Sequence, residues 1–211
     1  LLSVTNQDRT LSYRNTPSAE LTGIEFEFRS LLNSLFPVKQ GSLLDKLTVF
    51  GNLTFIQSKV NLKVTDVSNY YYNKGRVMQG QSPYVINAGC TYQDDDKQFS
   101  STLSVNRYGQ RIFLASNGDA LQNGTLIEPN LWENGRTQLD FQISKGFPEQ
   151  KLDLKVNIKD ILAQNLVFFE DTNDNRKYDK GKDALRSSQN FGRVISFTLT
   201  YNCLLYTSPS P

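Results

Sequence analysis

The string of residues with the clearest capacity for chemistry runs from Asp171 to Asp179. Oxygen-bearing side chains occupy its first, third, fifth and ninth positions, and these are Asp171, Asn173, Asn175 and Asp179. Carboxylate and amide oxygens at this spacing surround Ca²⁺ in calcium-binding loops. Two positions depart from that pattern, because Arg176 replaces the usual Gly and Lys182 replaces the bidentate acid, with Asp183 beside it. The spacing predicts a calcium loop, with a solvated, turn-rich loop as the alternative.

Aromatic side chains in long polar segments are the second candidates for binding. Tyr70, Tyr71 and Tyr72 are consecutive, and Trp132 lies in the next such segment. Exposed aromatic rings with a polar edge stack on sugar rings and similar ligands. The same residues would also suit an interfacial or loop-packing cluster. We therefore treat them as candidate ligand contacts with a packing role as the alternative.

Residue types needed for catalysis do not come together in this sequence. The chain has no His, which excludes imidazole as a general base or metal ligand. No nucleophile stands beside a base, and no Gly-rich phosphate loop or paired-carboxylate spacing occurs. The consecutive acids at 94–96 predict a solvated turn, because neighbouring side chains diverge. A formal charge of +2 without a basic block argues against nucleic-acid binding. We predict no enzyme activity and no cofactor other than calcium.

The elements that must position these residues are β-strands, because apolar and polar residues alternate with a period of two. From Ile24 to Arg29 every even position is large and apolar and every odd position is charged. Similar alternation predicts seven strands, at 24–29, 47–55, 84–92, 99–105, 138–144, 152–159 and 195–202. A partial strand is expected before Tyr13. The predicted fold class is all-β, an antiparallel meander of seven to eight strands.

The connections between these strands alternate in length. Those at 94–98 and 145–150 are short turns, and 31–46 is long enough for a short helical turn. Three others have more than twenty residues each, and these are 61–82, 109–136 and 162–192. Strict alternation of short and long places all the long connections at one end of an antiparallel sheet. Outer-membrane barrels have the same asymmetry, with short periplasmic turns and long extracellular loops.

Strand length and aromatic strand ends favour a membrane barrel over a soluble β-sandwich. Segments 47–57 and 152–162 reach the ~9–11 residues that a tilted strand needs to cross a bilayer. Aromatic residues at strand ends fit interfacial girdles, and these are Tyr84, Tyr92, Phe99, Tyr108 and Tyr201. Residues of apolar parity are expected to face lipid, among them Ile24, Phe26, Leu53, Phe55, Phe141, Leu154, Val156, Phe197 and Leu199. Their polar alternates would face a hydrated lumen.

Six stretches resemble the TonB-dependent outer-membrane receptors, in particular their SusC/RagA-like, glycan-importing branch. They are 15–28 (NTPSAELTGIEFEF), 50–59 (FGNLTFIQSK), 78–92 (MQGQSPYVINAGCTY), 104–112 (SVNRYGQRI), 139–145 (LDFQISK) and 154–171 (LKVNIKDILAQNLVFFED). The resemblance implies a transmembrane barrel of about 22 strands with an N-terminal plug. It also implies a location in the bacterial outer membrane, energy from the TonB complex and a SusD-like surface lipoprotein as partner. The transported solutes would be glycans, siderophores or similarly large molecules.

Residues 1–202 are expected to be the C-terminal segment of such a barrel and to form an open, curved sheet in isolation. The plug and the remaining strands would lie outside this chain, and outer-membrane lipid would cover its apolar face. Residues 203–211 lose the alternation and are expected to be a non-native tail, which leaves Cys90 as the only native thiol. Two alternatives stay open: a complete eight-stranded outer-membrane barrel acting as an adhesin or structural protein, and a soluble, carbohydrate-binding β-sandwich.

Overall fold

The computed structural model describes residues 2–5, 10–13, 18–61, 76–116, 121–122, 125–126 and 129–201. This part of the chain is almost entirely antiparallel β-structure, which confirms the predicted fold class. Residues 203–211, the expected non-native tail, lie outside the described residues.

Seven strands form one large sheet, in the same order in which they follow along the chain. They are β3 (Ser18–Leu31), β4 (Leu47–Asn61), β5 (Tyr84–Asp94), β6 (Phe99–Tyr108), β11 (Arg136–Phe147), β12 (Leu152–Lys159) and β15 (Val194–Tyr201). Six of the predicted strands lie within one of these, and the seventh, 195–202, matches β15 up to Tyr201, with residue 202 outside the described residues. The predicted meander is confirmed. The expected N-terminal strand is a separate hairpin of β1 (Leu2–Thr5) and β2 (Thr10–Tyr13). β3 and β15 are the two edges of the large sheet and do not pair with each other, so the sheet is open.

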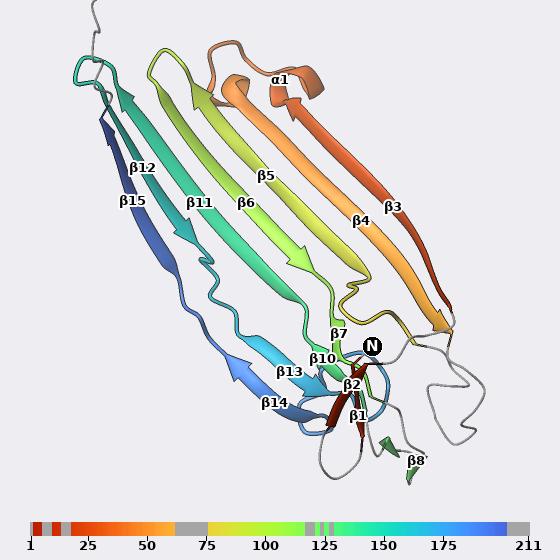
Figure 1. The fold of residues 1–211 in the computed structure, drawn as a ribbon. Helices are drawn as coiled ribbons and strands as arrows, with labels where there is room; N and C mark the ends of the chain where they lie inside the picture. The colour runs from red at the N-terminus through yellow and green to blue at the C-terminus, as the bar shows by residue number, and fades with distance from the viewer. Residues whose placement is uncertain are drawn as a thin grey trace, which may run out of the picture.

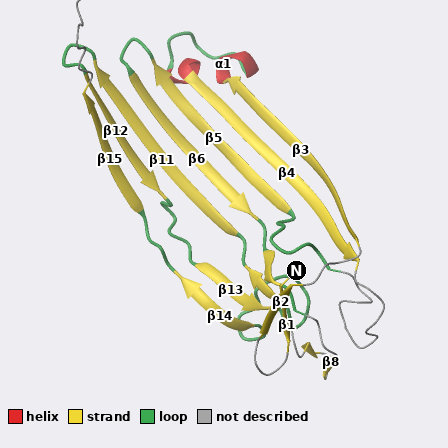
Figure 2. Ribbon diagram, in the orientation of Figure 1, coloured by secondary structure: helices red, strands yellow, loops and turns green. Residues whose placement is uncertain are grey.

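The short and long connections lie at opposite ends of the large sheet, as the alternation predicts (Figure 1). The short end carries the turns after β5 and β11. It also carries two helical turns between β3 and β4, α1 (Leu32–Leu35) and the 3₁₀ turn η1 (Leu43–Lys46). Figure 2 shows the helical segments together at this end. No helix in the described ranges has the length and apolarity of a membrane span.

Two of the long connections are not simple loops, because they contain a second sheet of four strands. Its strands are β7 (Arg111–Leu114), β10 (Leu131–Glu133), β13 (Leu166–Glu170) and β14 (Ala184–Gln189). Between β7 and β10 along the chain lies a separate hairpin of β8 (Leu121–Gln122) and β9 (Thr125–Leu126). The order β7–β10–β13–β14 repeats that of β6–β11–β12–β15, the strands to which they connect. The second sheet therefore extends the large one past a break (Figure 1).

A close approach of two backbones forms part of this break. A Cβ atom on Gly135 would lie 2.8 Å from the carbonyl oxygen of Tyr108 and 3.3 Å from the backbone nitrogen of Gln110. Both neighbours are main-chain atoms, so they cannot move aside as a flexible side chain would. Glycine is therefore required where the chain passes from β10 into β11.

One face of the large sheet is apolar across all seven strands. In register, Phe26 on β3 is opposite Leu53 on β4. Val156 on β12 is opposite Ile143 on β11 and Phe197 on β15. Phe26 is 56% exposed and Phe197 is 78% exposed. The sheet is a single layer in Figure 1, and no described element packs across this face.

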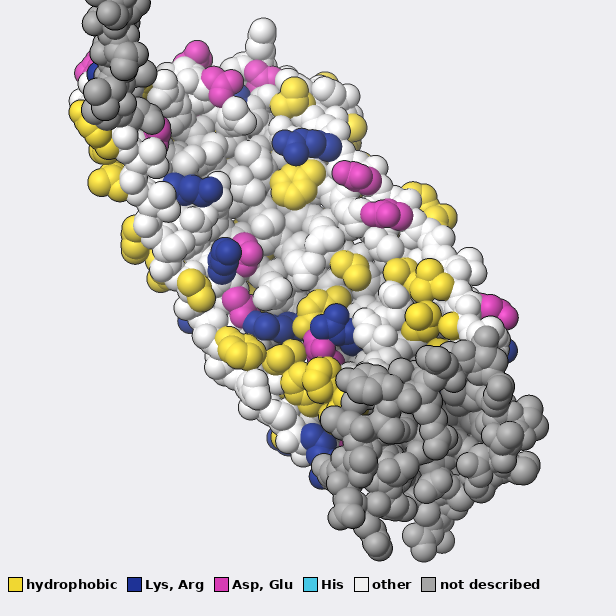
Figure 3. All heavy atoms as spheres, in the orientation of Figure 1, with side chains coloured by type: hydrophobic (Ala, Val, Ile, Leu, Met, Phe, Trp, Pro, Cys, Tyr) yellow, Lys and Arg dark blue, Asp and Glu magenta, His cyan; other side chains and the backbone are white. Residues whose placement is uncertain are grey.

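The opposite face is polar, and its side chains bond to one another across strands. Asn106 Nδ2 donates to Asn87 Oδ1 at 2.5 Å. The hydroxyls of Thr91 and Thr102 lie 3.0 Å apart. Figure 3 shows a polar face on which charged side chains are scattered among uncharged polar ones, while apolar side chains gather along the margins and near the long-connection end. Such a surface is suited to contact with water.

The buried apolar core lies at the long-connection end and consists of Ile112, Ala115, Trp132 and Phe169. Trp132 on β10 is opposite Ile112 on β7 and Phe169 on β13, so three strands of the second sheet meet at this side chain. Among the described residues, Val60 and Pro129 are the other buried apolar side chains. The described part of the large sheet therefore encloses almost no apolar core of its own.

We predict that Gly135→Ala lowers the free energy of unfolding by about 1–3 kcal/mol, the usual cost of forcing an extra carbon into a packed site. The cause is the clash of the new Cβ with the Tyr108 carbonyl oxygen. Urea unfolding of the chain refolded in detergent measures the effect. Asn134→Ala is the control, because it adds no atom at the break. Equal stability of the two variants would contradict the required glycine.

Candidate functional site

The predicted calcium loop connects β13 to β14, and its oxygen-bearing side chains converge. The Asp171 carboxylate accepts the backbone N–H groups of Asn175 at 3.1 Å and Arg176 at 2.6 Å. Asp179 Oδ2 accepts from the amides of Asn175 at 2.6 Å and Asn173 at 3.5 Å. Arg176 has a φ of +60°, in the left-handed region where calcium loops place Gly. The sharp turn therefore forms although glycine is absent.

Asp183 closes the loop from its other side. Its Oδ1 accepts the N–H of Thr172 at 3.2 Å, and its Oδ2 accepts the N–H of Asp179 at 2.7 Å. Asp171 and Asp183 are both buried, and each of their carboxylate oxygens has a backbone donor. In the described ranges, no group of three or more acidic, Cys or His side chains is arranged to hold a metal ion. The loop can thus close through its own hydrogen bonds, and calcium stays a prediction.

Electrostatics in the loop disfavour the charged form of Asp171. Burial raises the pKa of its carboxyl, and the charges of Asp183 and Asp174 raise it further. The N–H groups of Arg176 and Asn175 oppose this rise and lower the pKa. A bound cation would reverse the unfavourable ionisation of a buried acid that has other acids around it. This is the electrostatic argument in favour of the calcium prediction.

Of the four aromatic candidates, Trp132 is the one that the structure describes. Tyr70, Tyr71 and Tyr72 lie outside the described residues. Trp132 is 3% exposed and belongs to the buried core, so its ring is not an exposed stacking surface. Its packing role, which the sequence left as the alternative, is what the geometry favours. Part of the ring nevertheless lines a pocket.

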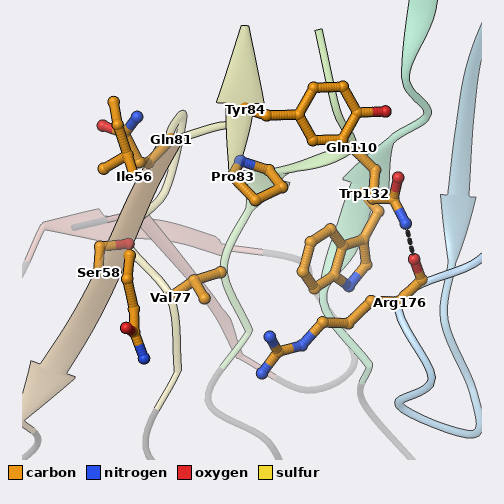
Figure 4. A pocket seen from close by; sticks show the side chains of 10 residues that line it. Ile56, Ser58, Val77, Gln81, Pro83, Tyr84, Gln110, Trp132 and Arg176 are labelled. Atoms are coloured by element: carbon orange, nitrogen blue, oxygen red, sulfur yellow. Dashed lines mark hydrogen bonds between the residues drawn. The ribbon is translucent and has the colours of Figure 1, made fainter. Parts of the chain in front are cut away.

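The pocket beside Trp132 has a volume of about 380 Å³ (Figure 4). Its lining comes from the end of β4, the segment that precedes β5, the break after β6, β10 and the calcium loop. The sequence did not reveal this site, because its walls come from five separate parts of the chain. Of its lining residues, Trp132 is the one that the sequence marked as a candidate ligand contact.

Backbone hydrogen bonds fasten the segment before β5 in the pocket wall. Ile56 donates its N–H to the Pro83 carbonyl at 2.9 Å, which ties the segment to β4. Gly80 donates to the Ile112 carbonyl at 2.8 Å, which ties it to β7. The pocket is therefore held open by main-chain contacts and does not depend on flexible side chains alone.

Ion pairs with buried carboxylates hold the strand that carries Trp132 and its neighbours. The Arg111 guanidinium donates to both carboxylate oxygens of Glu133, at 2.9 and 3.0 Å. Tyr108 Oη donates to the same carboxylate at 2.9 Å. Arg136 forms a second buried pair with Asp160. Because these charged side chains pair with one another, they help to orient β10 and β11.

The calcium prediction has a direct test. If calcium binds, millimolar Ca²⁺ should raise the melting temperature of the chain refolded in detergent, because an ion bound only by the folded state stabilises it. Asp179→Asn should weaken the response, because it removes a charged ligand. Asp96→Asn, which makes the same change at a 94% exposed position at the other end of the sheet, should leave it intact. An unchanged melting temperature in wild type would establish a loop closed by hydrogen bonds alone.

Comparisons with protein-family models, with curated proteins and with solved structures found no match to this chain. The resemblance to TonB-dependent receptors therefore rests on the sequence motifs. The function has to be argued from the faces of the sheet and the geometry of its two ends.

Proposed function

We propose that the chain forms the C-terminal portion of the barrel wall of a TonB-dependent outer-membrane receptor of the SusC/RagA-like type. Such a receptor takes up glycans, siderophores or similarly large solutes into the periplasm. The chain would contribute wall strands and long surface connections. It would perform no chemistry of its own.

The observation that carries the proposal is the uncovered apolar face. Side chains such as Phe26, Val156 and Phe197 lie in register on one side of seven strands, and no described element covers them. An apolar surface of this extent is unfavourable in water and marks contact with a membrane or another apolar partner. The strands are also long enough, since β4 has 15 residues and β11 has 12.

The polar face and the two ends of the sheet agree with this proposal. Small polar side chains bonded across strands, such as Asn87 with Asn106, suit the water-filled side of a barrel wall. The short turns at one end and the structured long connections at the other correspond to periplasmic and extracellular sides. The TonB complex, the plug and the SusD-like lipoprotein enter the proposal through the sequence resemblance alone.

Both alternative functions fit the geometry less well. In a soluble sandwich a second sheet would face the apolar side, whereas the four-stranded sheet here extends the first one end to end (Figure 1). In a complete eight-stranded barrel the first and last strands would pair. β3 and β15 instead lie at opposite edges of the described sheet.

The decisive experiment compares one substitution on the two faces of β12. Val156→Arg places a charge on the apolar face at mid-strand, and Asn157→Arg places the same charge on the polar face. We expect Val156→Arg to weaken insertion into phosphatidylcholine vesicles by about 2–4 kcal/mol, the cost of Arg near the bilayer midplane. Flotation of refolded chain with the vesicles, followed by urea titration, measures this cost. Asn157→Arg should be close to neutral.

Lys155→Ala is a further control, because it removes a charge from the polar face and should leave insertion unchanged. Equal effects of the two Arg substitutions would argue against a membrane-facing surface. A wild-type chain that stays in the aqueous fraction, folded and monomeric, would favour the soluble alternative.

A further inference from the structure

The pocket beside Trp132 has walls that are mainly apolar. Ile56, Val77, Pro83 and the Trp132 indole contribute them, together with the Tyr84 ring (Figure 4). They come from β4, the segment before β5, β5 itself and β10. A volume of about 380 Å³ is within the range of small-molecule sites and admits a ring or a short branched chain.

The charge in this pocket is one-sided. Among the described residues that line it, Arg176 is the one charged residue and none is acidic. The Arg176 guanidinium forms no ion pair with any described residue. Polar lining is otherwise supplied by uncharged groups such as Gln81 and Gln110. The electrostatic environment therefore favours an anion.

The position of Arg176 is set by its backbone. Its N–H donates to Asp171 Oδ2 at 2.6 Å, and its carbonyl oxygen accepts from Gln110 Nε2. Figure 4 shows the Arg176 side chain passing below the indole ring of Trp132. The loop therefore fixes the backbone of Arg176 beside the pocket, and the exposed side chain of Arg176 lines the pocket from there.

A second donor in the pocket wall lacks a partner. Trp132 is 3% exposed, and its buried Nε1 has no hydrogen-bond acceptor in the described part of the protein. An unsatisfied buried N–H is costly, and buried indole groups usually find an acceptor. Trp132 Nε1 is thus a second donor at this end of the sheet without a partner among the described residues, beside the Arg176 guanidinium.

We propose that this pocket binds an amphipathic carboxylate: a molecule with one ring or short branched apolar body and one carboxylate group. The apolar body occupies the space between Val77, Pro83 and Trp132. The carboxylate pairs with the Arg176 guanidinium, the geometry for which Arg is best suited. The proposal does not rest on the membrane function, because every lining residue belongs to this chain.

Trp132 is the only Trp in the sequence, so its fluorescence reports on this pocket directly. The chain, refolded in a neutral detergent, is titrated with 4-phenylbutyrate and, separately, with 4-phenylbutanol and 4-phenylbutylamine. These probes share one apolar body and differ in the head group. We expect 4-phenylbutyrate to give a saturable change in Trp132 emission, with half-saturation at a concentration about tenfold lower than for 4-phenylbutanol. The amine should bind more weakly than the alcohol.

Substitutions at Arg176 and at its neighbour Lys177 then show which positive charge the carboxylate requires. Arg176→Gln should weaken 4-phenylbutyrate binding about tenfold, and Arg176→Lys should retain most of the affinity. Lys177→Gln removes the same charge from a residue that does not line the pocket and should leave binding unchanged. An unchanged Trp132 emission maximum without ligand shows that each variant is folded.

Three results would overturn the proposal. One is the lack of any saturable change with 4-phenylbutyrate. Another is equal affinity for the three head groups, which would indicate partitioning into apolar surface or detergent. The third is equal loss in Arg176→Gln and Lys177→Gln, which would indicate general attraction to a basic loop. None of these results depends on whether the Val156→Arg variant inserts into vesicles.

Discussion

A sheet that gathers most of its large apolar side chains on one face must keep that face out of water, and the rest of this structure follows from that constraint. Seven strands contribute to the face in register, from β3 to β15, so covering a single strand would not satisfy it. The other face meets its hydrogen-bonding needs through cross-strand pairs such as Thr91 with Thr102. In the proposed barrel wall a bilayer would satisfy both faces at once, because lipid would cover one and water the other.

The two ends of the sheet differ because only one of them encloses a core. At the short-turn end the chain reverses within a few residues, and the helical turns there have no buried residues. At the other end the hairpins continue past the break at Gly135 and pack Ile112, Trp132 and Phe169 together. The pair of Arg111 with the buried Glu133 joins two of the same strands, β7 and β10. This end is therefore rigid enough to carry a binding site, whereas loops of that length without a core would not be.

Arg176 joins the two candidate sites into one structural unit. Its backbone belongs to the loop that Asp171 organises, and its side chain lines the pocket beside Trp132. The loop is also attached to the core, since the Tyr178 ring packs against Phe169 in a tilted arrangement with ring centroids 5.3 Å apart. Anything that orders or loosens this loop will change where the guanidinium lies. A cation bound in the loop would thus act on the backbone of Arg176, and an anion bound in the pocket would act on its guanidinium.

The period-two alternation by itself determined the seven strands of the large sheet, their faces and the segregation of short and long connections. The alternation was sufficient because those strands are long and every second residue of a strand lies on the same face of the sheet. It did not reveal β7, β10, β13 and β14, because three to six residues are too few to show a period. Nor did it place Arg176 beside Trp132, 44 positions away in the sequence (176 minus 132). Only the tertiary structure decided those features, because they depend on partners that meet through packing and on a backbone approach that sequence spacing does not record.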